Sequence, residues 1–333
     1  MGQWLPSARQ VPMRQKALKW LGILLASCAG IYFVSYARHA LSGKHLTQLV
    51  NVHVLLALLA LTLLYSLLIP TTVLAWTWLL RAMRQTTSYP RLLAIMATTQ
   101  FGKYLPGNIA QHIGRVALTR NTGIPLSVTL FSVAYEFLLI MVACSHVSLL
   151  TMLWAPPLAL IKWDIGKYRL PLVVLITSGA VLALALAPRA ASWLAKARAA
   201  RRGEKTYAPP RFKLNARTVM TCYVTYLVNF FIVGVGLWLV TRSLLGNSVH
   251  TPNVIFLTGA FAGSWILGFV APGAPAGLGI REALLSALLS GSLPAAQIVL
   301  VVVALRIATT VGDALNFAIG SGLMARYRLR AIR

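Results

Sequence analysis

Two polar passages broken by glycine and proline interrupt an otherwise apolar sequence. One reads QFGKYLPGNIAQHIGR and the other GFVAPGAPAGLGIRE, with Pro-Gly corners at Pro106-Gly107 and Pro272-Gly273. In each passage an arginine follows the corner proline by nine residues. An unpaired backbone N–H or C=O is costly in lipid, so such breaks persist at membrane depth only where protein or a water-filled cavity surrounds them. Two breaks, one in each half of the chain, are typical of transporter-like internal repeats.

Composition places the chain among multi-pass membrane proteins. Hydrophobic residues make up 58% of the sequence, charged residues 11%, and the mean hydropathy is +0.74. These values, with several apolar runs near 20 residues, exclude a soluble core. The 31 basic and 5 acidic residues do not indicate nucleic-acid binding, because the basic residues lie between apolar spans rather than on a polar folded face. Cationic loops against anionic lipid explain the charge instead.

We predict an all-α polytopic membrane protein, an inverted-repeat bundle of about six full spans plus two broken re-entrant helical hairpins. If the hairpins cross the membrane fully, eight helices span it. Pro70 is expected to kink the second span. The hairpin segments, 92–105 with 108–119 and 253–270 with 277–289, are mostly too short for the roughly 20 residues that a crossing needs. The complete spans are expected at 17–37, 50–80, 124–153, 170–187, 218–240 and 295–324.

Charge asymmetry predicts the topology. With both termini cytoplasmic, 20 of the 31 Lys and Arg residues lie inside and six outside, and the remaining five lie in or beside spans. The first half then starts from the cytoplasm and the second from outside, so the halves are inverted. The predicted units are a cytoplasmic segment 1–16, a first repeat 17–154, an external loop 155–169, a second repeat 170–325 and a basic cytoplasmic tail 326–333. The second repeat carries a basic cytoplasmic loop, 189–217, whose first part resembles an interfacial helix.

Charged residues inside spans are rare and are usually functional or paired. Glu136 and Arg306 occupy roughly equivalent places in the two halves, which suggests an ion pair between them. Asp313 lies on the same helical face as Arg306. Glu282 is either a proton carrier or a partner for backbone N–H groups. Together Glu136, Glu282 and Asp313 are candidates for proton coupling or, alternatively, for structural ion pairs between helices.

Arg115 and Arg281, the arginines after the two corners, are the main candidates for substrate binding. A guanidinium offers a rigid fork of donors that suits phosphate, and free N–H groups at a helix start add partial positive charge. Further donors for the substrate are expected from the first hairpin and from Arg306. The first-hairpin donors are Asn108, Gln111 and His112. We expect Lys103 and Arg120 to extend toward the cytoplasmic surface and Tyr104 to be an interfacial anchor.

At KYLPGNIAQHIGR and APGAPAGLGIRE the sequence resembles the transmembrane domain of lysylphosphatidylglycerol synthases and the flippase-like membrane proteins related to it. The resemblance covers nearly the whole chain and implies a lipid-translocating domain of the bacterial inner membrane. We expect a stand-alone member without the soluble aminoacyl-transferase domain of the bifunctional relatives. The second motif departs from the pattern at Pro275-Ala276, where relatives often carry a glycine pair.

Three functions are compatible with these features. The favoured one is a non-enzymatic flippase or transporter for a polar-headed lipid, with a phospholipid, an isoprenoid-linked intermediate or a hopanoid as the partner. The alternatives are a scaffold that recruits envelope enzymes through 189–217 and, less favoured, a membrane-embedded transferase. A transferase normally needs carboxylates, a histidine base or a metal site facing the headgroups, and the sequence has no HExxH motif and no cysteine cluster. No cofactor or metal is expected.

Overall fold

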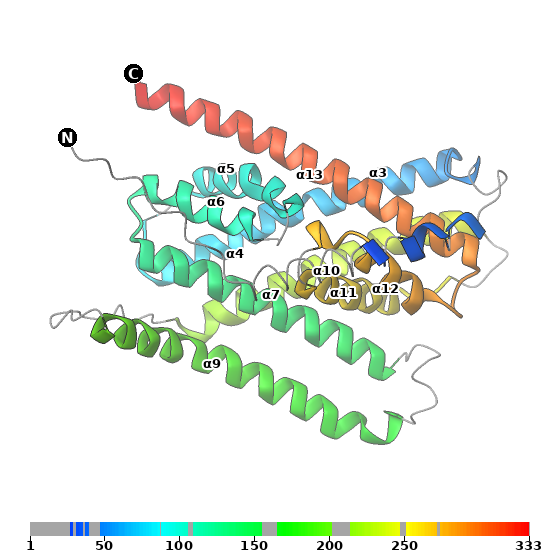
Figure 1. Cartoon of the computed structure of the whole chain (residues 1–333), viewed down its shortest axis with the longest axis horizontal. Helices are drawn as coiled ribbons and strands as arrows, with labels where there is room; N and C mark the ends of the chain where they lie inside the picture. The colour runs from blue at the N-terminus through cyan, green and yellow to red at the C-terminus, as the bar shows by residue number, and fades with distance from the viewer. Residues whose placement is uncertain are drawn as a thin grey trace.

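The computed structural model describes residues 27–28, 31–35, 37–39, 47–86, 88–105, 109–154, 165–201, 214–246, 251–271 and 274–332. These ranges are almost entirely helical (Figure 1). The helices discussed below are α3 Val52–Ser66, α4 Leu68–Ala82, α5 Tyr89–Thr99, η1 Gln100–Tyr104, α6 Ala110–Thr119, η2 Arg120–Thr122, α7 Leu126–Trp154, η3 Ile165–Tyr168, α9 Arg169–Arg201, α10 Ala216–Leu245, α11 Val254–Val270, η4 Pro275–Gly277, α12 Ile280–Leu289 and α13 Ala295–Ile332.

The protein is an all-α polytopic membrane protein, as the sequence predicts. In the described part of the chain, five helical stretches are long and apolar enough to cross a membrane: α3 with α4, then α7, α9, α10 and α13. The predicted first span, 17–37, falls largely outside the described residues.

Both predicted hairpins are present as pairs of packed helices. In the first, α5 has 11 residues and α6 has 10; in the second, α11 has 17 and α12 has 10. At 1.5 Å per residue, a ten-residue helix reaches about 15 Å, half of the roughly 30 Å hydrocarbon core. These lengths favour the re-entrant arrangement over full crossings. The corners Pro106, Gly107, Pro272 and Gly273 lie outside the described residues.

The two repeats interlock in an inverted arrangement. The equivalent helices α7 and α13 run in opposite directions, and the hairpins enter from opposite ends of the bundle (Figure 1). The first helix of each hairpin packs on the long helix of the other half, α5 on α13 and α11 on α7. The hairpin tips meet in the middle, where η1 contacts η4.

In both hairpins the two arms come into close contact at a glycine, and this glycine has the same place in each repeat. Gly102 lies four residues before the first corner, and a Cβ there would be 2.5 Å from the backbone nitrogen of Gln111. Gly268 lies four residues before the second corner, and its carbonyl oxygen would be 3.0 Å from a Cβ on Gly277. Gly277 corresponds to Gln111 in the repeat, so the two hairpins cross at equivalent residues.

Helix α10 occupies the centre of the bundle. It packs against α3, α4, α7, α11 and α13, because small residues let its backbone approach the neighbouring helices closely. A Cβ on Gly236 would be 2.4 Å from Leu61 on α3, and a Cβ on Gly234 would be 1.8 Å from Thr258 on α11.

Two of the spans contain an internal proline, and in each case a neighbouring helix donates a hydrogen bond to the backbone carbonyl that the proline leaves free. Pro70 cannot donate to the carbonyl of Ser66, four residues earlier, and the Nδ2 of Asn316 donates to that oxygen at 3.2 Å. The expected kink is a break between α3 and α4 at Leu67. In α9, Pro188 frees the carbonyl of Leu184, to which the hydroxyl of Tyr135 donates at 3.1 Å.

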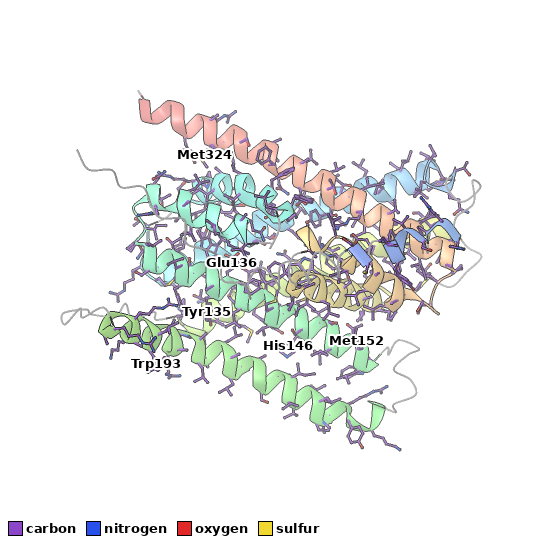
Figure 2. The ribbon with its side chains drawn as sticks, viewed as in Figure 1. Tyr135, Glu136, His146, Met152, Trp193 and Met324 are labelled. Atoms are coloured by element: carbon purple, nitrogen blue, oxygen red, sulfur yellow. The ribbon has the colours of Figure 1, made fainter. Side chains whose placement is uncertain are left out.

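Helix α9 differs from expectation in its length. The sequence suggests a span ending at Ala187 and a separate interfacial helix, but α9 continues unbroken through Pro188 to Arg201. Its main contact among the described long helices is with α7, at the edge of the bundle (Figure 1). Trp193, 69% exposed, lies near its C-terminal end (Figure 2).

The close approach within the first hairpin gives a direct test of its packing. Gly102→Ala should lower the unfolding temperature by several degrees, since overpacking at a backbone contact costs about 1–3 kcal/mol. Thermal unfolding in detergent can be followed with a thiol-reactive dye that reports exposure of the buried Cys144 and Cys222. The matched control is Gly179→Ala, where a Cβ meets nothing within 4 Å. Equal unfolding temperatures for both variants would contradict the packing described here.

Candidate functional site

A cavity of about 180 Å³ lies where η1 of the first hairpin approaches η4 of the second. Its walls come from both halves of the chain: α3, α4, α5, η1, α6 and α7 from the first, and α10, α11, η4, α12 and α13 from the second. This volume is many times what one water molecule needs. The charged side chains at its wall are Lys103, Arg115, Glu136, Arg281, Arg306 and Asp313.

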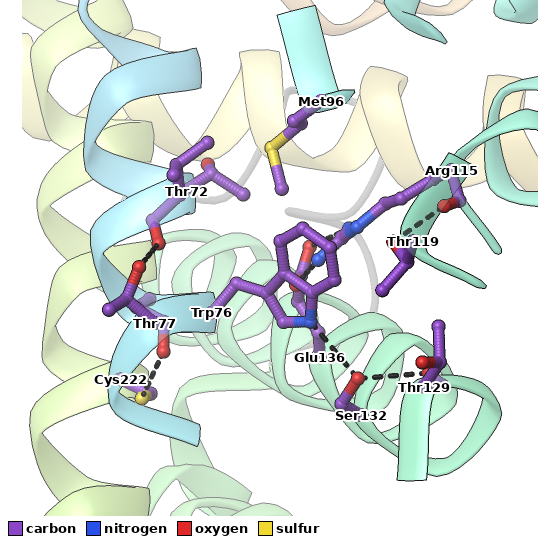
Figure 3. Close-up of polar contacts among 12 residues, drawn as sticks. Thr72, Trp76, Thr77, Met96, Arg115, Thr119, Thr129, Ser132, Glu136 and Cys222 are labelled. Carbon is purple, nitrogen blue, oxygen red and sulfur yellow. Dashed lines mark hydrogen bonds and ion pairs between the residues drawn. The ribbon is translucent and has the colours of Figure 1, made fainter. Parts of the chain in front are cut away.

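In the first half, Arg115 and Glu136 form a bidentate ion pair. Arg115 Nη1 donates to Glu136 Oε1 at 2.7 Å and Nη2 donates to Oε2, with both residues under 5% exposed. The pair forms because α6 packs on α7. Trp76 on α4 covers the guanidinium, with 3.6 Å between the arginine Cζ and the ring centroid (Figure 3). The indole Nε1 donates to Ser132 Oγ at 3.0 Å, which fixes the ring over the ion pair.

In the second half the two charges exchange places. Glu282 lies on the hairpin helix α12 and pairs with Arg306 on the following helix α13. The predicted ion pair between Glu136 and Arg306 is therefore wrong. Each of these residues pairs within its own half, because the second helix of each hairpin packs on the long helix that follows it.

Arg281 occupies the repeat position of Arg115 but has no carboxylate partner among the described residues. Its Nε is buried without a hydrogen-bond acceptor, and its guanidinium carbon lies 5.9 Å from the ring centroid of Trp265. Arg306 also has spare donor capacity, since its Nη2 is buried without an acceptor. The second hairpin thus presents an unneutralised cation to the cavity.

Asp313 collects three donors at the tip of the first hairpin. Lys103 Nζ lies 2.6 Å from Oδ2 and Tyr104 hydroxyl donates to the same oxygen at 2.6 Å, while Tyr65 hydroxyl donates to Oδ1 at 3.3 Å. The expectation that Lys103 extends to the membrane surface and that Tyr104 anchors at the interface is wrong. Both side chains instead join η1 to α13, because a fully buried carboxylate requires donors that water does not supply there.

The remaining candidates divide between the cavity and the undescribed corner. Gln111 and His112 line the cavity, and Gln111 Nε2 lies 3.3 Å from His112 Nε2. Asn108 lies outside the described residues. Arg120 is exposed in η2.

Sequence reasoning missed an aromatic wall on the second-half side of the cavity. Phe269 stacks between its neighbours, with ring centroids 5.1 Å from Phe137 and 5.4 Å from Trp265, and Phe230 lies 5.8 Å from Trp265. Aromatic residues are common in membrane helices, so their presence in the sequence does not by itself indicate a binding site.

Lys103 is the other cavity residue whose role the sequence did not reveal. Its position three residues before Pro106 identifies it only as a cation within a hairpin segment.

The fold and site define a multi-pass membrane protein in which two short helical hairpins enclose a charged cavity. Residues 19–315 match the family model described as the lysylphosphatidylglycerol synthase TM region, and the chain belongs to this family. The family relates the protein to lipid handling in membranes. No curated protein matches the chain.

Removing one partner of the buried pair of Arg115 and Glu136 should destabilise the protein more than replacing both partners. Arg115→Met leaves Glu136 uncompensated and should cost about 3–5 kcal/mol of stability. Arg115→Met with Glu136→Gln should recover much of this loss, because no isolated charge remains. Thermal unfolding of the two single variants and the double variant in detergent measures the coupling. Additive effects of the single substitutions would show that the residues do not act as a pair.

Proposed function

We propose that the protein is a flippase or transporter that moves a polar-headed lipid across the bacterial inner membrane. The observation that carries this proposal is the unneutralised Arg281 at a cavity shared by both hairpin tips. An anionic headgroup would supply the ion-pair partner that Arg281 lacks among the described residues. Alternating exposure of the cavity through two inverted hairpins would carry the headgroup from one leaflet to the other.

The outer faces of the hairpins support a lipid as the substrate. On the first hairpin, Ile109 and Ile113 are 62% and 64% exposed, whereas Gln111, His112 and Arg115 line the cavity. One short helix therefore has a polar inner face and an apolar outer face that lipid tails can contact. On this proposal the headgroup crosses inside the bundle while its acyl or isoprenoid tails stay in the bilayer.

Three carboxylates are candidates for coupling lipid movement to a proton gradient. Glu136, Glu282 and Asp313 each lie in an ion pair, so their contacts support a structural role directly. Glu282 is the best placed for proton coupling, because its Oε2 is buried without a partner. Lipid movement that depends on a pH gradient in the parent protein and becomes gradient-independent in Glu282→Gln would support coupling through this residue.

The C-terminal part of α9 is proposed to lie against anionic headgroups of the cytoplasmic leaflet. Lys196, Arg198 and Arg201 follow the exposed Trp193, a combination typical of an interfacial helix. Each such cation contributes about 1 kcal/mol near an anionic surface. This placement agrees with cytoplasmic termini.

Lipid movement can be tested in reconstituted vesicles that contain fluorescent phospholipid in both leaflets. Dithionite quenches only outer-leaflet label, so transport appears as loss of the protected half of the fluorescence. Arg281→Gln should slow this loss at least tenfold, because it removes the unneutralised cation. Arg242→Gln, at an exposed arginine outside the cavity, should match the parent protein. Equal rates for protein-free vesicles and the parent protein across phospholipid, isoprenoid-linked and hopanoid probes would refute the proposed function.

A further inference from the structure

The charge balance of the cavity limits what it can hold. Four cations, Lys103, Arg115, Arg281 and Arg306, line the cavity together with two carboxylates, Glu136 and Asp313. A third carboxylate, Glu282, lies in an adjoining pocket and pairs with Arg306, and histidine is counted as neutral. One positive charge remains. An uncompensated charge away from bulk water is costly, and an arriving group with one negative charge removes that cost.

The location of the excess charge is fixed by the pairing. Lys103 is held by Asp313, and both Nη atoms of Arg115 are used by Glu136. Buried donors without an acceptor remain on Arg115 Nε, Arg281 Nε and Arg306 Nη2, and all three arginines line the cavity. Of these three, Arg281 alone has no carboxylate partner among the described residues, and Arg306, on the helix after the second hairpin, lines the same cavity.

Glu282 restricts this site in a way that has no counterpart in the first half. Its carboxylate pairs with Arg306, so Arg281, Arg306 and Glu282 together carry one net positive charge. A group with two or more negative charges would leave net negative charge beside a carboxylate that is 6% exposed. We infer that Arg281 and Arg306 bind a lipid headgroup that carries a single negative charge, such as a phosphodiester, and that Glu282 sets this limit. The inference rests on the proposed function for the lipid part of the ligand.

The aromatic wall supports a ligand that is not charged throughout. Trp265 stacks on Phe269, Phe137 contacts Phe269 in a tilted arrangement, and Arg281 lies beside Trp265. Such a surface packs against the apolar or weakly polar part of a headgroup, while the arginines hold its anionic oxygen atoms. A group with several charges would have to lose its water against these rings.

The test compares short lipids with identical tails and different headgroup charge. Dioctanoyl phosphatidylglycerol carries one negative charge, dioctanoylglycerol pyrophosphate carries at least two, and dioctanoylglycerol carries none. Equilibrium binding to the purified protein in non-ionic detergent should be tightest for phosphatidylglycerol. The deacylated glycerophosphoglycerol distinguishes a lipid site from a site for soluble phosphate esters, and it should bind at least tenfold more weakly than the dioctanoyl form.

Two variants separate charge from folding. Arg281→Gln should weaken phosphatidylglycerol binding at least tenfold, and it should fold, because it removes an unpaired cation without leaving an isolated partner. Arg281→Lys should retain part of the affinity. Glu282→Gln raises the net charge of the cavity by one, so it should shift the preference toward the pyrophosphate lipid at least fivefold. Arg242→Gln is the control with parental binding.

Each outcome has a defined meaning. Preference for the pyrophosphate lipid in the parent protein, or an unchanged preference in a folded Glu282→Gln, would overturn the charge limit. Equal affinity for glycerophosphoglycerol would overturn the lipid part of the inference. Selective binding without transport in vesicles would leave the site standing and refute the proposed function. Transport that is unchanged in Arg281→Gln and Glu282→Gln would refute the site and leave the proposed transport function standing.

Discussion

The need to neutralise charge at membrane depth shapes the centre of this protein. Three ion pairs connect hairpins to long helices: Arg115 with Glu136, Glu282 with Arg306, and Lys103 with Asp313. Each carboxylate is nearly or fully buried, so none can rely on water to stabilise its charge. The pairs join helices that pack against one another, and the cavity lies between these helices.

The two halves show how a repeated unit can become functionally unequal. Both have an arginine nine residues after the corner proline, yet among the described residues only Arg115 of these two forms an ion pair with a carboxylate. In the second half the acid lies on the hairpin helix, as Glu282, and pairs with Arg306. The arginine of the first hairpin is thus held in an ion pair, whereas Arg281 has no carboxylate partner among the described residues.

Backbone breaks in the spans follow the same rule as the charges, because lipid supplies no hydrogen-bond partners. The carbonyls freed by Pro70 and Pro188 accept hydrogen bonds from Asn316 and Tyr135, both on other helices. A proline in a span therefore connects helices as well as bending one. Asn316 lies three residues after Asp313, so α13 stabilises the first half by both charge and hydrogen bonding.

The sequence by itself determined the membrane class, most helix positions, the two hairpins and the family, because long apolar runs and Pro-Gly corners act locally. It also identified Arg115, Glu136, Arg281, Glu282, Arg306 and Asp313 as the charged residues of interest, since charge is rare in spans. Only the tertiary structure decided their partners. The position of Arg306 in the chain is compatible with pairing to either Glu136 or Glu282. Nothing in the sequence around Lys103 indicates that it pairs with Asp313, 210 residues away. Pairing depends on which helix faces pack together, and many distant contacts fix that jointly.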